Sequence, residues 1–154
     1  MKAVLNRDFS PNYKLYRVSV DRDRSGLFYR IIFTGYEEDG RNHYLKRSEH
    51  NSYMFTYCIK GHGYIKYHNK VNEFKKDDLI FINCMDEHEM WTDKDGMTLI
   101  YIHLQSPALE SFLDYVYNTT GNIIKIPNDS IGFVPTIKGI HKSIDEKKFD
   151  EYEA

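Results

Sequence analysis

Acidic side chains in the middle of the chain are the first candidates for chemistry, because two carboxylates that face each other can serve as general acid and general base. They occur in short polar stretches that follow apolar runs, a pattern typical of turns between strands. The residues are Asp77, Asp78, Asp86, Glu87 and Glu89. Side chains in turns are mostly solvated, so no pair of these carboxylates is expected to converge. The chain therefore lacks the pattern of an acid–base active site.

Cysteine and histidine are the other residues that could bind a metal or act on a substrate. The two cysteines, Cys58 and Cys84, lie in an expected strand and at the end of its neighbour, where reduced thiols packed in a core are the common arrangement. His88 follows a loop that contains Asp86 and Glu87. Three interpretations of it stay open: a surface residue, a core residue with one satisfied nitrogen, or a polar contact in the mouth of a barrel.

The stretch that must position these residues runs from Tyr53 to Leu104, and its pattern predicts a sheet that folds back on itself. Short apolar, β-branched and aromatic runs are separated by turn residues, and none is long enough for a helix. We expect strands over residues 53–59, 64–68, 71–74, 79–82, 90–91 and 97–104. The glycines of Gly61-His62-Gly63 predict a tight hairpin turn. The fully apolar run 79–82 predicts a strand buried on both faces.

Segments on both sides of this stretch complete the expected fold. Upstream, we expect an N-terminal arm, two extended runs and a loop, over residues 1–12, 13–20, 27–36 and 37–42. Downstream, Ser106-Pro107 predicts the start of a helix and Gly121 its end. A short strand over 123–126 and a narrow apolar stripe over 131–144 follow. Such a stripe is typical either of a helix that covers a sheet or of one half of a dimer interface.

The order of these motifs resembles the cupin domain of AraC-type (AraC/XylS family) transcriptional regulators. The matching segments are Ile59-Lys60-Gly61-His62-Gly63, Phe74 to Ile82, His88 and Ile100 to Leu104, and the likeness extends through Gly35-Tyr36, Arg47 and the helical segments. The resemblance implies a mainly β fold, a cupin-type jelly roll (double-stranded β-helix) followed by C-terminal α-helices. It implies an arm at 1–12, a barrel at 13–104, and helices with a short strand at 105–154. In the family an arm can fold over the ligand pocket, which Phe9, Pro11 and Tyr13 would do here.

Metal-binding cupins hold one ion with a His-x-His pair, a glutamate and a later histidine. Counted back from Gly61, the first three positions are Ser48, His50 and Met54, and the later one is His88. Two imidazoles without a third protein ligand seldom hold zinc or iron. We therefore expect no metal and no other cofactor.

The resemblance also implies a ligand site inside the barrel. Residues equivalent to Arg47, His88 and Tyr101 contact the ligand in the family, and a guanidinium suits hydroxyls and carboxylates alike. For Tyr101, a core tyrosine with its hydroxyl at the surface stays the alternative. Because side chains alternate along strands, Met90 is expected on the face of His88. By the same rule the face of Tyr101 includes Leu99 and His103, and that of Met54 includes Thr56 and Cys58. The expected ligand-binding residues are Arg47, His50, Met54, His88, Met90 and Tyr101.

Composition limits the partners of the chain. It contains 21 Lys and Arg against 23 Asp and Glu, a formal net charge of −2. That balance lacks the basic excess that neutralises phosphates, so the chain by itself is not expected to bind nucleic acid. The N-terminus has no apolar targeting segment, and no apolar run has the length of a membrane span. We expect a cytoplasmic protein without membrane contact.

These observations favour one function over another. We expect the small-molecule-sensing and dimerisation domain of an AraC-type transcriptional regulator, with a sugar or other small polar effector in the barrel and no enzymatic activity. A homodimer would form through the C-terminal helices, and DNA would be contacted by a helix-turn-helix domain that these residues do not include. The alternative is a free-standing cupin enzyme of the sugar isomerase or dioxygenase type, which needs a metal or an acid–base pair.

Overall fold

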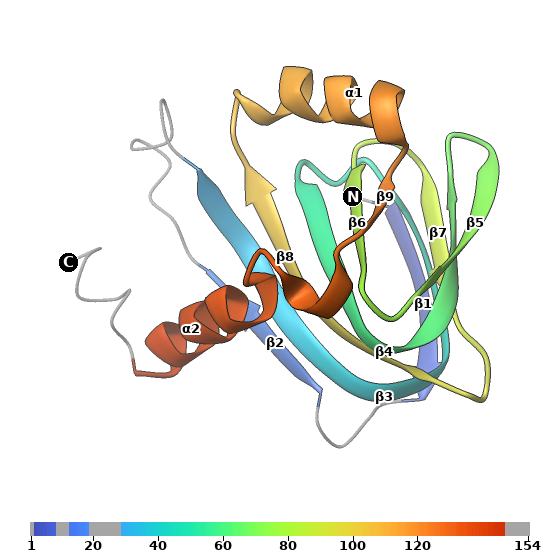
Figure 1. Ribbon diagram of the computed structural model, residues 1–154, viewed down its shortest axis with the longest axis vertical. Coiled ribbons are helices and arrows are strands. Elements are labelled where there is room, and N and C mark those ends of the chain that lie inside the picture. The colour runs from blue at the N-terminus through green and yellow to red at the C-terminus, as the bar shows by residue number, and fades with distance from the viewer. Residues whose placement is uncertain (1, 9–12, 19–28, 147–154) are drawn as a thin grey trace.

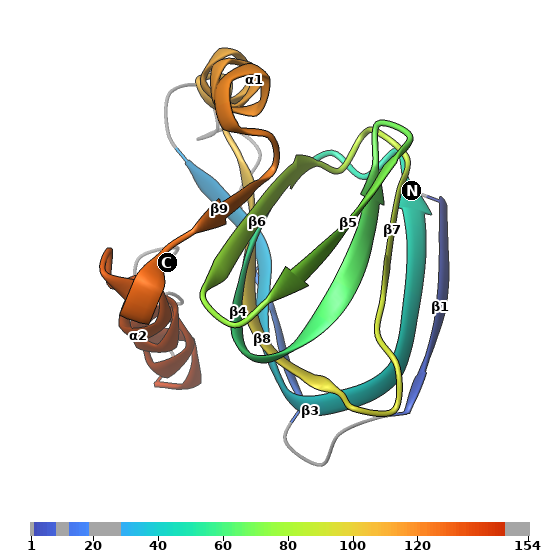
Figure 2. The same ribbon diagram turned by 45° about the vertical axis from the view of Figure 1, so that its right-hand side comes forward.

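Two long strands organise the fold, because each of them bends and so takes part in both of its sheets (Figure 1). They are β3 (Arg30–Ser48) and β4 (Tyr53–Tyr67). The structure is a computed structural model that describes residues 2–8, 13–18 and 29–146. In it the two sheets face each other and close into a barrel (Figure 2). The prediction of a mainly β chain with C-terminal helices is confirmed.

All strand pairs are antiparallel, and each sheet contains one half of each long strand. Sheet A has the order β1–β3–β7–β4–β5, and sheet B has the order β2–β3–β8–β4–β6–β9. The shorter strands are β1 (Lys2–Asp8), β2 (Lys14–Arg17), β5 (Lys70–Lys75), β6 (Asp78–Asn83), β7 (His88–Trp91), β8 (Met97–Gln105) and β9 (Ile123–Lys125).

The predicted hairpin turn at Gly61-His62-Gly63 is wrong, because β4 runs through these residues without reversing. Lys60 pairs with Thr98 in sheet B, and His62 pairs with Lys75 in sheet A. Gly61 lies between them with φ of 82°, and a Cβ there would lie 2.3 Å from the carbonyl oxygen of Gly96. The glycine thus allows β4 to bend and to approach the backbone of Gly96 closely, and the strand does not reverse there.

Two upstream predictions also need correction. The loop expected over 37–42 lies inside β3, where an irregular register between Glu37 and Gly40 and the positive φ of Asp39 bend the strand. The arm expected over 1–12 is an edge strand where the structure describes it, since β1 pairs with β3, Ala3 opposite Arg47. Residues 1 and 9–12, including Phe9 and Pro11, lie outside the described residues.

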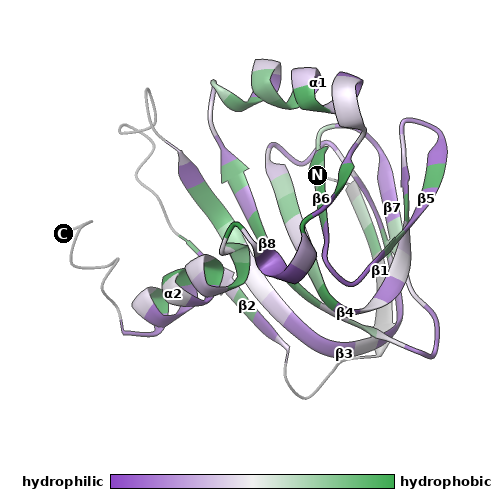
Figure 3. Ribbon diagram, in the orientation of Figure 1, coloured by the Kyte–Doolittle hydropathy of each residue, from purple (hydrophilic) through white to green (hydrophobic). Residues whose placement is uncertain are grey.

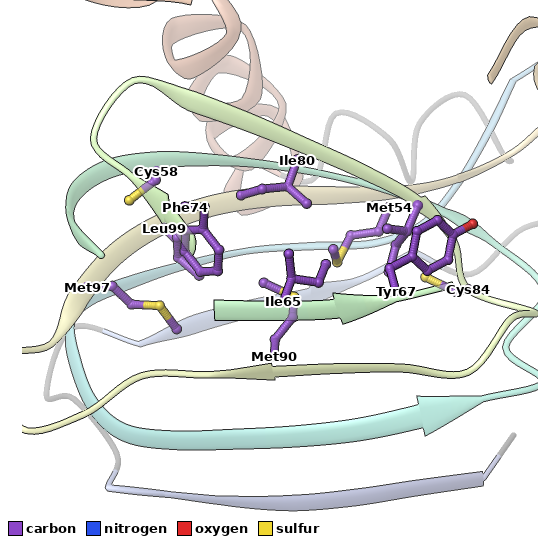
Figure 4. Packing of buried hydrophobic residues seen from close by; sticks show 11 residues of the cluster. Met54, Cys58, Ile65, Tyr67, Phe74, Ile80, Cys84, Met90, Met97 and Leu99 are labelled. Carbon is purple, nitrogen blue, oxygen red and sulfur yellow. The ribbon is translucent and has the colours of Figure 1, made fainter. Parts of the chain in front are cut away.

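The barrel interior carries the main apolar core, to which β4, β5, β6, β7 and β8 contribute alternate residues. Figure 4 shows Phe74, Ile65, Leu99 and Met90 meeting between the sheets. The core residues are Met54, Cys58, Ile65, Tyr67, Phe74, Ile80, Ile82, Cys84, Met90, Met97 and Leu99. Both cysteines are buried free thiols, as predicted.

Two helices cover the outer face of sheet B, where green and purple segments alternate along each of them (Figure 3). α1 (Leu109–Thr120) packs Leu109 and Leu113 against Phe81, and α2 (Phe133–Asp145) packs Ile137 against Ile100 and Ile102. Strand β6 therefore has apolar contacts on both faces, as predicted.

The helix ends follow local chemistry. The Gly121 N–H donates to the Tyr117 carbonyl and ends α1 as predicted. Ahead of α2, after a short 3₁₀ turn (Pro127–Asp129), the Asp129 carboxylate accepts the N–H groups of Phe133 and Val134, both at 2.8 Å. Pro135 falls in the first turn of α2, where its missing N–H costs no helical hydrogen bond.

Candidate ligand-binding cavity

A cavity of about 240 Å³ lies inside the barrel beside the core, with walls from both sheets. Alternation along the strands brings Leu99, Tyr101 and His103 of β8 to one wall, opposite inward side chains of β3 and β7. The lining residues are Ala3, Tyr13, Leu15, Arg17, Phe33, Glu37, His43, Leu45, Arg47, His50, Met54, Thr56, Met90, Leu99, Tyr101 and His103.

Strand register orders these side chains in three layers. In the first, Phe33 and Met54 flank His103 across sheet B, and Arg47 of sheet A lies over the Phe33 ring, 5.9 Å from Cζ to centroid. In the second, Thr56 pairs with Tyr101, and Leu45 pairs with Met90 in the facing sheet. In the third, Glu37 pairs with Leu99, and His43 Nδ1 lies 3.6 Å from a Glu37 carboxylate oxygen. Ionisable groups thus occupy both ends, and the middle layer combines two apolar side chains with two hydroxyls.

The structure brings five of the six predicted site residues to this cavity: Arg47, His50, Met54, Met90 and Tyr101. His88 differs from expectation. It is buried beside Arg47, its partner across the β3–β7 pair, and does not line the cavity. Its Nε2 lies 3.4 Å from the Arg47 Nε–H donor, and its Nδ1 lies 2.9 Å from the Asp86 carbonyl. His88 therefore contacts the arginine, and a ligand contact of its own stays a prediction.

Several lining residues escape sequence reasoning, notably Phe33, Glu37, His43 and Leu45. The alternation of 43, 45 and 47 along β3 is a usable signal, but the loop expected over 37–42 hides it. Thr56, Leu99 and His103 follow correctly from alternation with Met54 and Tyr101. Cys58 does not line the cavity, because its thiol turns to the carbonyls of Lys60 and Gly61 at the β4 bend.

Arg47 is the main charge of the first layer. Its side chain is buried, with 8% of its surface exposed. Besides the contact with His88, one terminal nitrogen lies 3.9 Å from Cys84 Sγ. No carboxylate of the described residues forms an ion pair with the guanidinium, which stays charged at any physiological pH. A buried cation therefore faces the cavity without an anionic partner.

Three histidines near Arg47 are neutral at physiological pH. Burial, reinforced by the Arg47 charge, lowers the pKa of His50 to about 4 and the pKa of His103 well below its usual value. Burial also lowers the pKa of His88 to about 4. The Ser52 hydroxyl lies 2.6 Å from His50 Nδ1 and 2.9 Å from His103 Nδ1, so it can donate to one ring and accept from the other.

The residues at the cupin metal positions do not fit an ion. Met54 replaces the carboxylate and Ser48 the first histidine, and Arg47 directs its positive charge at the His88 nitrogen that an ion would need. His50 is hydrogen-bonded to Ser52 instead, and His88 to Arg47 and the Asp86 carbonyl.

A different set, His50, Cys84 and His103, brings its ligand atoms within 4.8 Å of one another. The Ser52 hydroxyl lies between the two imidazoles, and burial raises the pKa of the Cys84 thiol. An ion there would have to displace the hydroxyl and deprotonate the thiol. A second set lies at the surface, where acidic groups often gather without a metal: His62, Asp93 and Asp95.

Comparison with known proteins agrees with this geometry. The sequence profile of the AraC-like ligand binding domain matches residues 30–153. The chain belongs to this family. No curated protein sequence is significantly similar to it. Among solved structures, the AraC-like transcriptional activator CuxR is similar with a TM-score of 0.54 and 10% identity, over 94% of this chain and 62% of that one.

Two further similar structures are cupin domains. The Cupin_2 domain of an XRE family transcriptional regulator from Enterobacter cloacae has a TM-score of 0.42 and 12% identity, over 68% of this chain and 97% of that one. A cupin protein from Bacteroides fragilis has a TM-score of 0.44 and 14% identity, over 66% and 91%. The predicted cupin-type jelly roll followed by helices is confirmed for this AraC-like domain. Within the described residues, no helix is long and apolar enough to cross a membrane.

Proposed function

We propose that this AraC-like domain senses a small molecule for a transcriptional regulator, with a sugar or other small polar effector bound inside the barrel. The observation that carries the proposal is the cavity of about 240 Å³ with one buried arginine that forms no ion pair within the described part of the chain, beside largely apolar walls. A small number of placed polar groups in an apolar pocket is the usual character of a reversible ligand site. Effector binding would favour one arrangement of the regulator over another.

An enzymatic role has less support from the same residues. Among the described residues the cavity contains one buried carboxylate, Glu37, and the lowered pKa values of His50 and His103 make these two imidazoles poor proton carriers near neutral pH. A free-standing cupin enzyme remains the alternative because His50, Cys84 and His103 converge. Stoichiometric iron, manganese or zinc in protein purified without chelator would favour that alternative.

Dimerisation and DNA binding are parts of the same proposal. α1 buries Leu109 and Leu113 against the barrel, while Phe112 and Tyr115 remain 60% and 71% exposed. Exposed aromatic side chains of this kind are typical of subunit interfaces. We infer a cytoplasmic homodimer through the C-terminal helices, in which DNA is contacted by a separate helix-turn-helix domain. This chain covers 62% of CuxR, so a protein of the length of CuxR has room for a further domain outside the matching part.

The test is a thermal-shift screen against sugars and small acids. A ligand present at 100 times its Kd should add about 2.7 kcal/mol to the free energy of unfolding. We expect Arg47→Ala to abolish the stabilisation by every hit, and Arg41→Ala, on the exposed side of the same strand, to preserve it. Hits that stabilise the Arg47 variant as well as the wild type would exclude the cavity as the effector site.

A further inference from the structure

The polar groups of the cavity wall are incompletely satisfied. Buried polar atoms in folded proteins nearly always have hydrogen-bond partners, so exceptions at one place indicate a missing molecule. Thr56 Oγ1 and His43 Nδ1 are buried, line the cavity and have no hydrogen-bond partner within the described part of the chain, although a Glu37 carboxylate oxygen lies 3.6 Å from His43 Nδ1. They belong to the second and third layers of the wall.

The charge of the first layer is also unbalanced. Leaving a buried guanidinium without an anion costs free energy, and a protein retains such a group where a ligand supplies the counter-charge. The residues in contact with Arg47 are neutral: His88, the Cys84 thiol and the Phe33 ring. His50, which lines the cavity nearby, is neutral as well. An anionic group of a ligand in the cavity would supply the counter-charge.

The middle of the cavity is poorly suited to a sugar. Leu45 and Met90 of sheet A face Phe33, Met54 and Leu99 of sheet B, and none of these side chains can hydrogen-bond a ring of hydroxyls. The hydroxyls of Thr56 and Tyr101 are the polar groups at this depth. Each unpaired hydroxyl of a buried sugar would cost free energy. An apolar body avoids this cost and gains from burial.

We propose that the effector is a small organic acid whose carboxylate pairs with Arg47 and whose apolar body lies between Leu45 and Met90 on one side and Phe33 on the other. This inference rests on the proposed sensing function and narrows its ligand class. A cavity of 150 Å³ holds benzene, so a cavity of about 240 Å³ suits a ligand of about ten non-hydrogen atoms. The Thr56 hydroxyl, one layer deeper, is available to a second polar atom of the same molecule.

The experiment compares acids with their own primary amides, which have the same shape without the charge. Titration calorimetry of the chain with benzoate, phenylacetate, 3-phenylpropanoate and hexanoate, each beside its amide, measures the preference directly. We expect at least one acid to bind, and to bind at least about tenfold more tightly than its amide, since a charge-assisted hydrogen bond is stronger than a neutral one. Arabinose and glucose complete the set as neutral polyols.

Variants assign the preference to one residue. Arg47→Gln should remove the difference between acid and amide, Arg47→Lys should retain part of it, and Arg41→Gln should leave it unchanged. If Arg47→Gln does not fold, the lysine variant and the wild-type acid-to-amide ratio still decide the question. Equal binding of acid and amide, or an acid that binds Arg47→Gln as tightly as wild type, overturns the inference. Tight binding of a sugar in the cavity would overturn the organic-acid inference and leave the proposed sensing function in place. Binding of neither acids nor sugars would count against both the inference and the proposed function.

Discussion

Arg47 illustrates how one side chain can serve binding at the expense of stability. Its buried charge has no anionic partner within the described residues, so an apolar residue of similar length should relieve a desolvation cost. We expect Arg47→Met to raise the free energy of unfolding of the ligand-free chain by about 1 kcal/mol or more, and to lose ligand binding. Urea denaturation with and without ligand measures both effects. A loss of stability in this variant would mean that the guanidinium has a structural role that outweighs its burial.

The burial of His88 predicts that the free energy of unfolding depends on pH. Burial holds its pKa at about 4 in the folded chain against 6.5 when unfolded. As pH falls through 6.5, the unfolded chain gains a proton that the folded chain does not, so stability decreases between about pH 6.5 and 4. Between pH 7 and 5 the loss from this residue should be about 2 kcal/mol. Urea unfolding of wild type and His88→Gln at both pH values checks it, because the variant should show a shallower decline.

At the scale of the elements, the bend of β4 decides whether the two sheets can close. Gly61 has a positive φ and leaves no room for a Cβ against Gly96. We expect Gly61→Ala to lower the free energy of unfolding by about 2 kcal/mol or more. Gly139 in α2 is the matched control, because a Cβ there meets nothing within 4 Å and alanine favours a helix by up to about 1 kcal/mol. Thermal unfolding of both variants should show opposite shifts.

Sequence patterns predict some of these strands correctly and divide others where the structure has one continuous strand. Short apolar, β-branched and aromatic runs correctly predict β6, β8 and the first half of β4, because that signal depends only on neighbouring residues. The same patterns divide β3 at Glu37 to Asn42 and β4 at Gly61, where polar residues and glycine are typical of turns. Whether such residues reverse a strand or only bend it depends on partner strands distant in sequence. For β4 those partners are β8 before the bend and β5 after it.

At the scale of the whole molecule, the outward face of α1 should control assembly. Phe112 and Tyr115 are exposed on it. If the chain forms a homodimer there, Phe112→Glu combined with Tyr115→Glu should convert it to a monomer, because an interface cannot bury two unpaired carboxylates. Light scattering after size exclusion measures the mass. Val71→Glu is the control, since Val71 is equally apolar and exposed on β5. A monomeric wild type would contradict the proposed dimer.

The amino-acid sequence alone determined that this protein is mainly β with helices after the barrel, and that methionine, Met54, occupies the position where metal-binding cupins carry a carboxylate. These properties depend on residue type and local spacing. Only the tertiary structure decided that β3 and β4 each build both sheets, that His88 lies beside Arg47, and that no carboxylate of the described residues pairs with that arginine. The physical reason is that the partner of a charge, unlike the face of a strand, is set by contacts between segments distant in the chain.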